Sequence, residues 1–293
     1  MFTPIGPTSL SNGCRFDLSY TKQLHRELES SALSIKFVIE GEEVYNFNGK
    51  DHKVKTQQFL TINNKRCTAI IDSDIESKGF CMGIPYHLLD EIMASLSEQT
   101  PKANFIDYLH GDDFFERVTN AGNSRMGSYL QCLATTLQTS LMEHSKIYIE
   151  ELFLRVAEHA IAEQLNAYKE YSTIAVSKIE IQKDIYRKLL EARDYMNAHL
   201  AQDVKMEDVA SLAHISEYYF YRLFRSAFKK TPYQYLLERR LEQAKKLLKK
   251  GMPVSHIAIE TGFKDIYSFS KAFKRQEQIS PTHYLQKILL SKQ

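Results

Sequence analysis

Residues 218–236 read YYFYRLFRSAFKKTPYQYL, and residues 267–285 read YSFSKAFKRQEQISPTHYL. From residue 220 onward the second stretch repeats the apolar pattern of the first at a constant offset of 49 positions. Aromatic and basic positions repeat as well, in the pairs Tyr218 and Tyr267, Arg222 and Lys271, and Arg225 and Lys274. An internal repeat of this kind indicates that one supersecondary unit is used twice.

Each copy is predicted to be a helix-turn-helix unit. In the first copy, Met206 to Ala213 can form a short helix, and Ser216 is placed to cap a second helix that begins at Glu217. In the second copy, Val254 to Thr261 precedes Gly262, which suits a turn with positive φ. At about 100° per residue, the second helices should bury Phe220, Leu223, Phe224 and Ala227 in one copy and Phe269, Ala272 and Phe273 in the other.

The opposite faces of these second helices carry aromatic and basic residues, namely Tyr218, Arg222, Arg225 and Lys229, then Tyr267, Lys271 and Lys274. Arg and Lys can bind guanine edges or phosphates, and a Tyr hydroxyl can reach a phosphate. A single charged face is usually only a solvated one. Because this face recurs in register, we expect both copies to contact DNA.

A helix between the copies should set their separation. Thr231-Pro232 supplies a cap and a first-turn proline, and an apolar stripe follows up to Gly251. A helix of about 18 residues spans roughly 27 Å, comparable with the ~34 Å between successive major grooves. One monomer could therefore read two adjacent grooves.

These stretches resemble the DNA-binding domain of AraC/XylS-type bacterial transcription regulators, over about residues 179–284. Two segments carry the resemblance: EYYFYRLFRSAFKKTPYQYLLERRLEQAKKLL, and VSHIAIETGFKDIYSFSKAFKR followed by ISPTHY. The chain departs from the family pattern at Lys229 and Gln278, where glycine is common. The resemblance implies that the recognition helices contact DNA through Tyr218, Tyr221 and Arg222 in the first copy and through Tyr267, Ser270 and Lys271 in the second, with contacts to the DNA backbone from Arg225 and Lys274.

Charge divides the chain into two parts. Residues 178–293 hold 22 Lys or Arg and 13 Asp or Glu, a net charge of +9, whereas the preceding residues have 16 and 23, a net charge of −7. A basic module suits a polyanion. The chain shows neither a signal peptide pattern nor an apolar run long enough to span a membrane, so a cytoplasmic location is expected.

The first 84 residues read as a series of short strands. The expected strands cover 34–39, 44–47, 53–55, 58–62, 68–71 and 78–84, with Asn48-Gly49 as a hairpin turn. This pattern predicts a β-sandwich or barrel. The stretch FVIEGEEVYNFNGKDHKVKTQQFLTI is similar to the cupin-like sensor domain that often precedes an AraC-type module.

Helices are expected after these strands. Residues 87–96 and 128–168 are the candidates, and 147–164 has a broad apolar face that could pair two subunits or cover the sheet. A short linker at 169–178 leads to a helix at 179–200. The predicted organisation is α+β: a cupin-like regulatory domain at 1–110, a helical dimerisation or linker region at 111–172, and an all-α AraC-type DNA-binding domain at 173–293.

Histidines and cysteines are too scattered to predict a metal or catalytic site. A cupin metal site needs several convergent ligands, whereas His25, His52 and His87 lie apart in sequence. Cys14, Cys67, Cys81 and Cys132 form no C-x-x-C pair and are interpreted as reduced structural thiols. A metalloenzyme with a cupin domain, or a repair protein that transfers alkyl groups to a cysteine, is the alternative hypothesis.

The sequence thus predicts a DNA-binding transcription regulator that is not an enzyme. Its expected partners are double-stranded DNA, a second copy of the chain, a small-molecule effector and, for the favoured activator role, RNA polymerase. No cofactor is predicted. The last three partners rest on the family resemblance, and the residues identify no effector.

Overall fold

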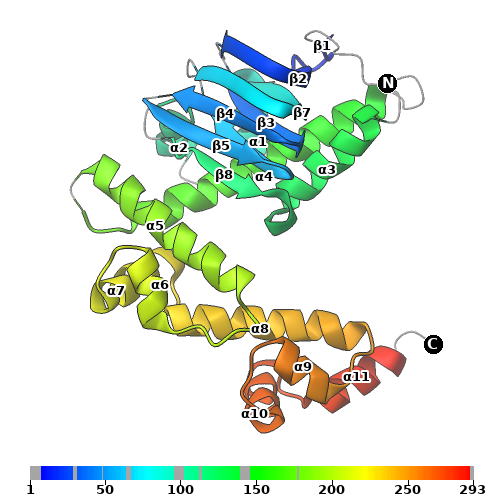
Figure 1. Cartoon of the computed structure of the whole chain (residues 1–293), viewed down its shortest axis with the longest axis vertical. Helices are drawn as coiled ribbons and strands as arrows, with labels where there is room; N and C mark the ends of the chain where they lie inside the picture. The colour runs from blue at the N-terminus through cyan, green and yellow to red at the C-terminus, as the bar shows by residue number, and fades with distance from the viewer. Residues whose placement is uncertain are drawn as a thin grey trace. The chain divides into compact units, whose positions relative to one another are not determined.

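The computed structural model describes residues 8–28, 32–47, 49–63, 67–95, 102–111, 114–138, 146–176 and 178–290. It divides the chain into two compact units, Met1–Tyr168 and Lys169–Gln293. All strands of the described residues lie in the first unit (Figure 1). Residues 111–168 lie in this first unit, and residues 169–172 lie in the second.

The first unit contains an eight-stranded antiparallel sheet that curls into a nearly closed barrel (Figure 1). Its main path runs β1-β2-β7-β3-β6-β8, and β4 pairs with both β5 and β7. Because Phe47 pairs with Lys50, the hairpin expected after residue 47 is present, although Asn48 lies outside the described residues. The strands are β1 (Thr8–Ser9), β2 (Arg15–Leu28), β3 (Ala32–Glu40), β4 (Glu42–Phe47), β5 (Lys50–Lys55), β6 (Gln58–Ile62), β7 (Cys67–Pro85) and β8 (Arg117–Asn120).

The expectation of two separate strands at 68–71 and 78–84 was wrong, since both belong to the single strand β7. The polar run between them resembles a loop but contains neither glycine nor proline. β2 pairs with both halves of β7, with a register shift between Thr21 and Gln23, so the strand continues through the polar run. On the other edge of β7, the first half pairs with β4 and the second half with β3.

The sheet buries both of its faces. Inside the barrel lies a cluster that includes Val38, Leu60 and Ile62. On the other face, Phe16 contacts Phe153 of a helix, with ring centroids 5.6 Å apart. The helices of this unit are α1 (Tyr86–Ser95), α2 (Lys102–His110), the short 3₁₀ helix η1 (Ala121–Asn123), α3 (Arg125–Gln138) and α4 (Lys146–Ser172), whose last turn belongs to the second unit.

The apolar face expected at 147–164 covers the sheet of its own chain. Seven of its eight apolar side chains are buried, whereas Ile147 is 77 % exposed. The sequence left open whether this face pairs two subunits or covers the sheet, and its burial within one chain corresponds to covering the sheet. Pairing of two subunits by these helices stays a prediction.

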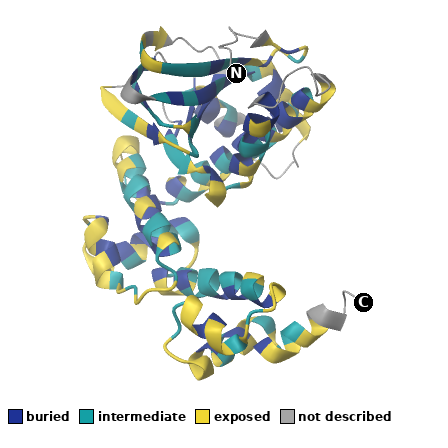
Figure 2. Cartoon of the chain, turned by 45° about the vertical axis from the view of Figure 1, so that its right-hand side comes forward, coloured by how far each residue is buried: buried dark blue, intermediate teal, exposed yellow. Residues whose placement is uncertain are grey.

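The second unit is entirely helical within its described residues. Its helices are α5 (Ile179–Ala198), α6 (Met206–Leu212), α7 (Glu217–Phe228), α8 (Pro232–Lys249), α9 (Val254–Glu260), α10 (Ile266–Glu277) and α11 (Pro281–Leu290). Buried positions gather where these helices face one another, and exposed positions lie on their outer sides (Figure 2). The expected stripe on α7 is buried at all four positions, whereas Ala272 on α10 is only half-buried.

The linker expected at 169–178 is shorter than predicted, because α4 continues to Ser172 without a helix-breaking residue. The residues after it are fixed to the second unit. Thr173 donates a hydrogen bond to the carbonyl of Ser226, and the Ser226 hydroxyl donates one to the carbonyl of Thr173. Gln182 donates to the carbonyl of Ile174 at 2.7 Å. The linker is therefore held against α5 and α7.

Within the described ranges, none of the helices combines the length and apolarity that a membrane-spanning segment requires. The histidines considered as metal ligands lie on three different elements, with His25 on β2, His52 on β5 and His87 on α1. Over the same ranges, no group of three or more His, Cys, Asp or Glu side chains is arranged to hold a metal ion.

Candidate nucleic-acid interface

The two helix-turn-helix units share the geometry of their turns. His214 in the first turn and Gly262 in the second both have positive φ, 51° and 74°. The amide of the next residue donates to a carbonyl in the preceding helix in both cases: Ile215 to Ala210 at 3.2 Å, and Phe263 to Ala258 at 2.9 Å. The turns therefore match at an offset of 48, one residue less than the offset of the helices that follow.

The second turn contains the extra residue, and the helix caps differ accordingly. Asp265 accepts a hydrogen bond from the amide of Ser268 at 2.6 Å and caps α10. This bond leads the causes that lower the pKa of the Asp265 carboxyl. The expected side-chain cap from Ser216 is absent, although Ser216 occupies the N-cap position of α7. Asp265 itself was missed, although it lies 49 positions after Ser216 and could have been found from the repeat.

The two departures from the family pattern keep the left-handed conformation that glycine would favour. Lys229 ends α7 with φ 59°, and Gln278 ends α10 with φ 63°. Each side chain folds back to donate to the carbonyl three residues earlier, Lys229 to Ser226 at 2.8 Å and Gln278 to Arg275 at 2.9 Å. These bonds satisfy carbonyls that a helix end leaves free. The turn after each helix is thus preserved without glycine.

Each unit also has the same aromatic core. The rings of Phe220 and Phe224 lie 5.5 Å apart, and those of Phe269 and Phe273 lie 5.6 Å apart. A tyrosine after the Ser/Thr-Pro element completes each set, with Phe224 to Tyr235 at 5.8 Å and Phe273 to Tyr284 at 5.4 Å. Tilted and edge-to-face contacts of this kind orient the rings specifically. They fix both α7 and α10 to the helix that follows.

The eight candidate contact residues form four equivalent pairs with matching exposure. Tyr218 is 78 % exposed and Tyr267 is 73 % exposed, the largest values among aromatic residues of the described chain. The cations of both helices are exposed, and the remaining pair is half-buried in both copies. The four pairs are Tyr218 and Tyr267, Tyr221 and Ser270, Arg222 and Lys271, and Arg225 and Lys274.

The cations on these two faces have no acidic partner among the described residues, namely Arg222, Arg225, Lys271 and Lys274. Basic residues nearby on α8 do have partners: Lys245 lies 2.9 Å from Glu277, and Arg239 pairs with Glu242. The charges of Lys245 and Arg239 are therefore neutralised within the fold. Those on α7 and α10 remain available to an external anion.

Two further side chains shape the face of α7. The Arg222 guanidinium lies 5.8 Å from the ring centroid of Tyr219, a neighbour that the sequence reasoning did not include. Burial, followed by the charge of Glu217, raises the pKa of the Tyr221 hydroxyl. The hydroxyl therefore stays protonated at neutral pH and can donate a hydrogen bond.

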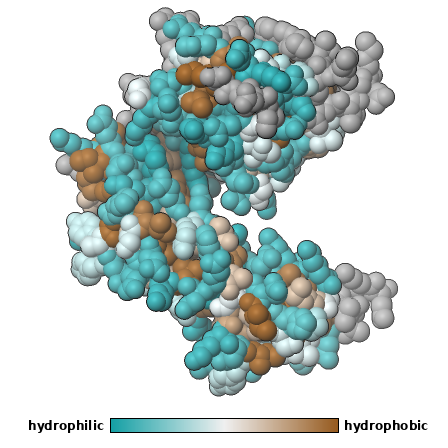
Figure 3. Space-filling model, viewed as in Figure 1, coloured by the Kyte–Doolittle hydropathy of each residue, from teal (hydrophilic) through white to brown (hydrophobic). Residues whose placement is uncertain are grey.

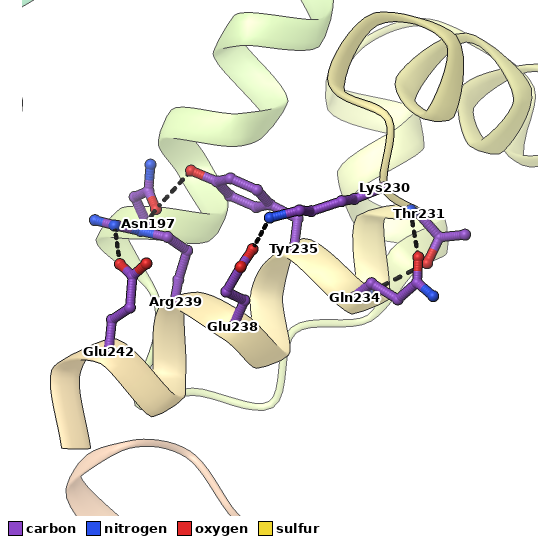
Figure 4. A network of polar contacts seen from close by, with 8 residues as sticks. All are labelled: Asn197, Lys230, Thr231, Gln234, Tyr235, Glu238, Arg239 and Glu242. Carbon is purple, nitrogen blue, oxygen red and sulfur yellow. Dashed lines mark hydrogen bonds and ion pairs between the residues drawn. The ribbon is translucent and has the colours of Figure 1, made fainter. Parts of the chain in front are cut away.

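Helix α8 begins with the cap that the sequence predicted. Thr231 accepts from the amide of Gln234, and the Gln234 side chain accepts from the amide of Thr231, which completes a capping box (Figure 4). One turn later, Asn197 of α5 accepts hydrogen bonds from Tyr235 and Arg239 (Figure 4). The helix spans 18 residues, as expected, and is fixed to α5.

The second turn packs against the end of α5. Arg240 donates to the carbonyl of Leu200 at 2.9 Å and to that of Gln202 at 2.6 Å. A Cβ atom at residue 262 would lie 2.8 Å from Nη2 of Arg240, so the glycine permits this approach. Together with the ion pair from Lys245 to Glu277, these contacts fix α9 and α10 relative to α5 and α8.

The surface of the second unit is mostly hydrophilic on the face seen in Figure 3, with hydrophobic residues in small separate patches. Leu212, Ile259 and Ile266 are exposed apolar residues on its helices. Scattered apolar side chains are normal on a protein surface. Fold and surface together define this unit as a double helix-turn-helix domain that presents two equivalent basic and aromatic faces.

Comparisons with known proteins agree with this description. The family described as "Helix-turn-helix domain" matches residues 209–287. The probable transcriptional regulator LumQ of Photobacterium leiognathi is 38 % identical over 92 residues, 31 % of this chain and 37 % of LumQ. The regulatory protein PocR of Salmonella typhimurium is 33 % identical over 102 residues, 34 % of each chain. These matches span little more than a third of each relative.

A solved structure of the DNA-binding domain of the transcription factor AdpA, in complex with a target DNA, is 31 % identical. It covers 34 % of this chain and 91 % of that domain, with a TM-score of 0.33. The C-terminal part of the chain is therefore a helix-turn-helix domain of the AraC type.

Proposed function

We propose that this protein is a transcription regulator that reads two adjacent major grooves of DNA with α7 and α10. The observation that carries the proposal is that four residues of α7 and four of α10 form equivalent pairs of similar exposure, and that no acidic residue of the described chain neutralises their cations. A solvated face would have no reason to repeat its exposed tyrosine and both of its cations in register.

Each contact residue has a role that its chemistry supports. Arg222 and Lys271 lie one helical turn beyond the exposed tyrosines and reach base edges, where guanine offers two acceptors. Arg225 and Lys274 lie nearly one further turn along and neutralise phosphates. The ring of Tyr218 or Tyr267 covers a thymine methyl or a sugar, and the hydroxyls of Tyr221 and Ser270 donate to phosphate oxygens.

The first unit serves as the regulatory part in this proposal. A small effector bound there, or a second copy of the chain, alters how two subunits present their recognition helices. The activator role further requires a contact with RNA polymerase. These three partners are proposed from the family resemblance.

Selection of bound duplexes from a random DNA library by the full-length protein tests the proposal. The salt concentration has to be physiological and stated, because phosphate contacts make affinity strongly salt-dependent. We expect two short motifs about one helical turn apart, that is ~10 base pairs. Recovery of a single motif would refute readout by two helices. So would the absence of any enriched motif both with the full-length protein and with a protein that lacks residues 1–168.

A further inference from the structure

A lysine lies inside the barrel of the first unit, on the face of β3 that carries apolar neighbours. Lys36 is 3 % exposed. In the sheet, Lys36 is paired with Cys81 of β7 on one side and with Leu60 of β6 on the other. Cys81 is in turn paired with Asp17 of β2. Burial of an ammonium group costs free energy unless a partner compensates its charge. Lys36 therefore requires a partner inside the barrel.

That partner is a cysteine. Nζ of Lys36 lies 2.5 Å from Sγ of Cys81, and no other hydrogen-bond partner of this ammonium occurs among the described residues. The nearby carboxylate of Glu43 accepts hydrogen bonds from Tyr45, Ser19 and Ser77 instead. The ring of Tyr45 completes the surroundings, with its centroid 5.9 Å from Nζ.

The charge state of Lys36 follows from this contact. Burial by itself would lower the pKa of the lysine, yet the pKa is raised. The charge of Cys81 and its hydrogen bond favour the ammonium form, and Cys67 and Glu43 add smaller effects. A positive charge thus remains against the sulfur atom at neutral pH.

Among the four cysteines, only Cys81 combines a cationic neighbour with access to solvent. Cys14 and Cys67 are buried, and burial raises the pKa of both thiols, to about 12 for Cys14. Cys132 is half-buried like Cys81, but its neighbour is the hydroxyl of Tyr148 at 3.5 Å. Reactive cysteines typically occur in partly exposed, electropositive surroundings.

We propose that Cys81 is a modification site for hydroperoxides, with Lys36 as the group that holds the thiolate and protonates the leaving group. The sulfur attacks the terminal oxygen of the peroxide, an S–O bond forms and the O–O bond breaks. The departing hydroxide or alkoxide takes a proton from the Lys36 ammonium, which regains one from solvent. Sulfur loses two electrons to become a sulfenic acid, and the peroxide is reduced to water or an alcohol.

A small oxidant suits the position of Cys81. The residue lies within β7, is paired on both sides, by β2 and by β3, and is half-buried as a whole. A hydroperoxide needs to bring only its terminal oxygen to the sulfur.

The test treats the full-length protein with hydrogen peroxide in the presence of dimedone, which traps sulfenic acids, and measures labelling of each cysteine by peptide mass spectrometry. We expect Cys81 to be labelled several-fold faster than Cys132, the internal control of similar exposure. Equal rates at the two cysteines would overturn the proposal, and this comparison needs no variant.

The Lys36→Met variant removes the charge and keeps an apolar chain of similar length. It should reduce labelling of Cys81 to the rate of Cys132 and leave Cys132 unchanged. Unchanged labelling of Cys81 in a folded Lys36→Met protein would also overturn the proposal. Cys132→Ser, as a matched control, should leave the Cys81 rate as it is in the wild type.

Discussion

Gly262 approaches Leu200 so closely that a Cβ atom at residue 262 would lie 2.3 Å from the carbonyl oxygen of Leu200. The same carbonyl accepts a hydrogen bond from Arg240, so the end of α5, the middle of α8 and the turn of the second unit meet at one point. This contact fixes the turn between α9 and α10 against α5 and α8.

Gly262→Ala should therefore destabilise the second unit more than the backbone strain of an alanine with positive φ would by itself. Alanine at φ 74° costs of the order of 1 kcal/mol, and displacement of backbone and Arg240 adds about 1–2 kcal/mol more. Gly251→Ala is the matched control, because Gly251 has φ 79° but open space around its Cβ position. Chemical denaturation measures both. Equal losses of stability would contradict the close contact.

The left-handed residues that end α7 and α10 allow a three-way comparison. Lys229→Ala retains the unfavourable φ of 59° and loses the bond to Ser226, so it should destabilise. Lys229→Gly loses the same bond but relieves the backbone, and should exceed Lys229→Ala in stability by roughly 0.5–1 kcal/mol. Gln278→Gly and Gln278→Ala should differ in the same way. Thermal or chemical unfolding measures the difference, and an alanine variant as stable as its glycine counterpart would exclude a left-handed conformation there.

The Asp265 cap predicts a dependence on acid pH. The folded pKa lies below the ordinary value of 3.8, so the cap stabilises the protein above that pH and its contribution is lost as the pH falls further. Asp265→Ser keeps a capping oxygen that does not titrate and should remove this part of the pH dependence. Unfolding measured from neutral to acid pH tests the sign. If the Asp265→Ser variant lost as much stability at acid pH as the wild type, the loss would come from other carboxylates.

Contacts to phosphate and to bases should differ in their response to salt and sequence. Arg225→Ala should weaken binding equally on all duplexes and reduce the slope of log K against log salt by about 1. Arg222→Ala should instead cost roughly 1–3 kcal/mol on the selected site and relax the preference at one base pair. Binding titrations at several salt concentrations, on specific and random duplexes, separate the two. An Arg225→Ala effect confined to one sequence would reassign that residue.

The repeat made the second unit predictable. Aromatic and basic residues recur at a fixed offset, so the buried stripe of α7, its exposed face and the start of α8 could all be derived from local spacing. The absence of the Ser216 cap could not, because a cap requires a side-chain rotamer that the sequence does not specify.

The barrel was only partly predictable for a different reason. The first residues of β2 alternate, with Phe16 and Leu18 buried, but its second half is too polar to stand out as a strand. The contact from Lys36 to Cys81 joins residues 45 positions apart and depends on strand register, which hydrophobic pattern alone does not set.

The central claim is that α7 and α10 each read their own groove. The most direct measurement repeats the selection from random duplexes with the full-length Arg222→Ala and Lys271→Ala variants beside the wild type. We predict that each variant loses base preference in only one of the two motifs, a different motif for each, and retains the other about one helical turn away. Loss of preference in the same motif by both variants, or in neither motif, would contradict the account.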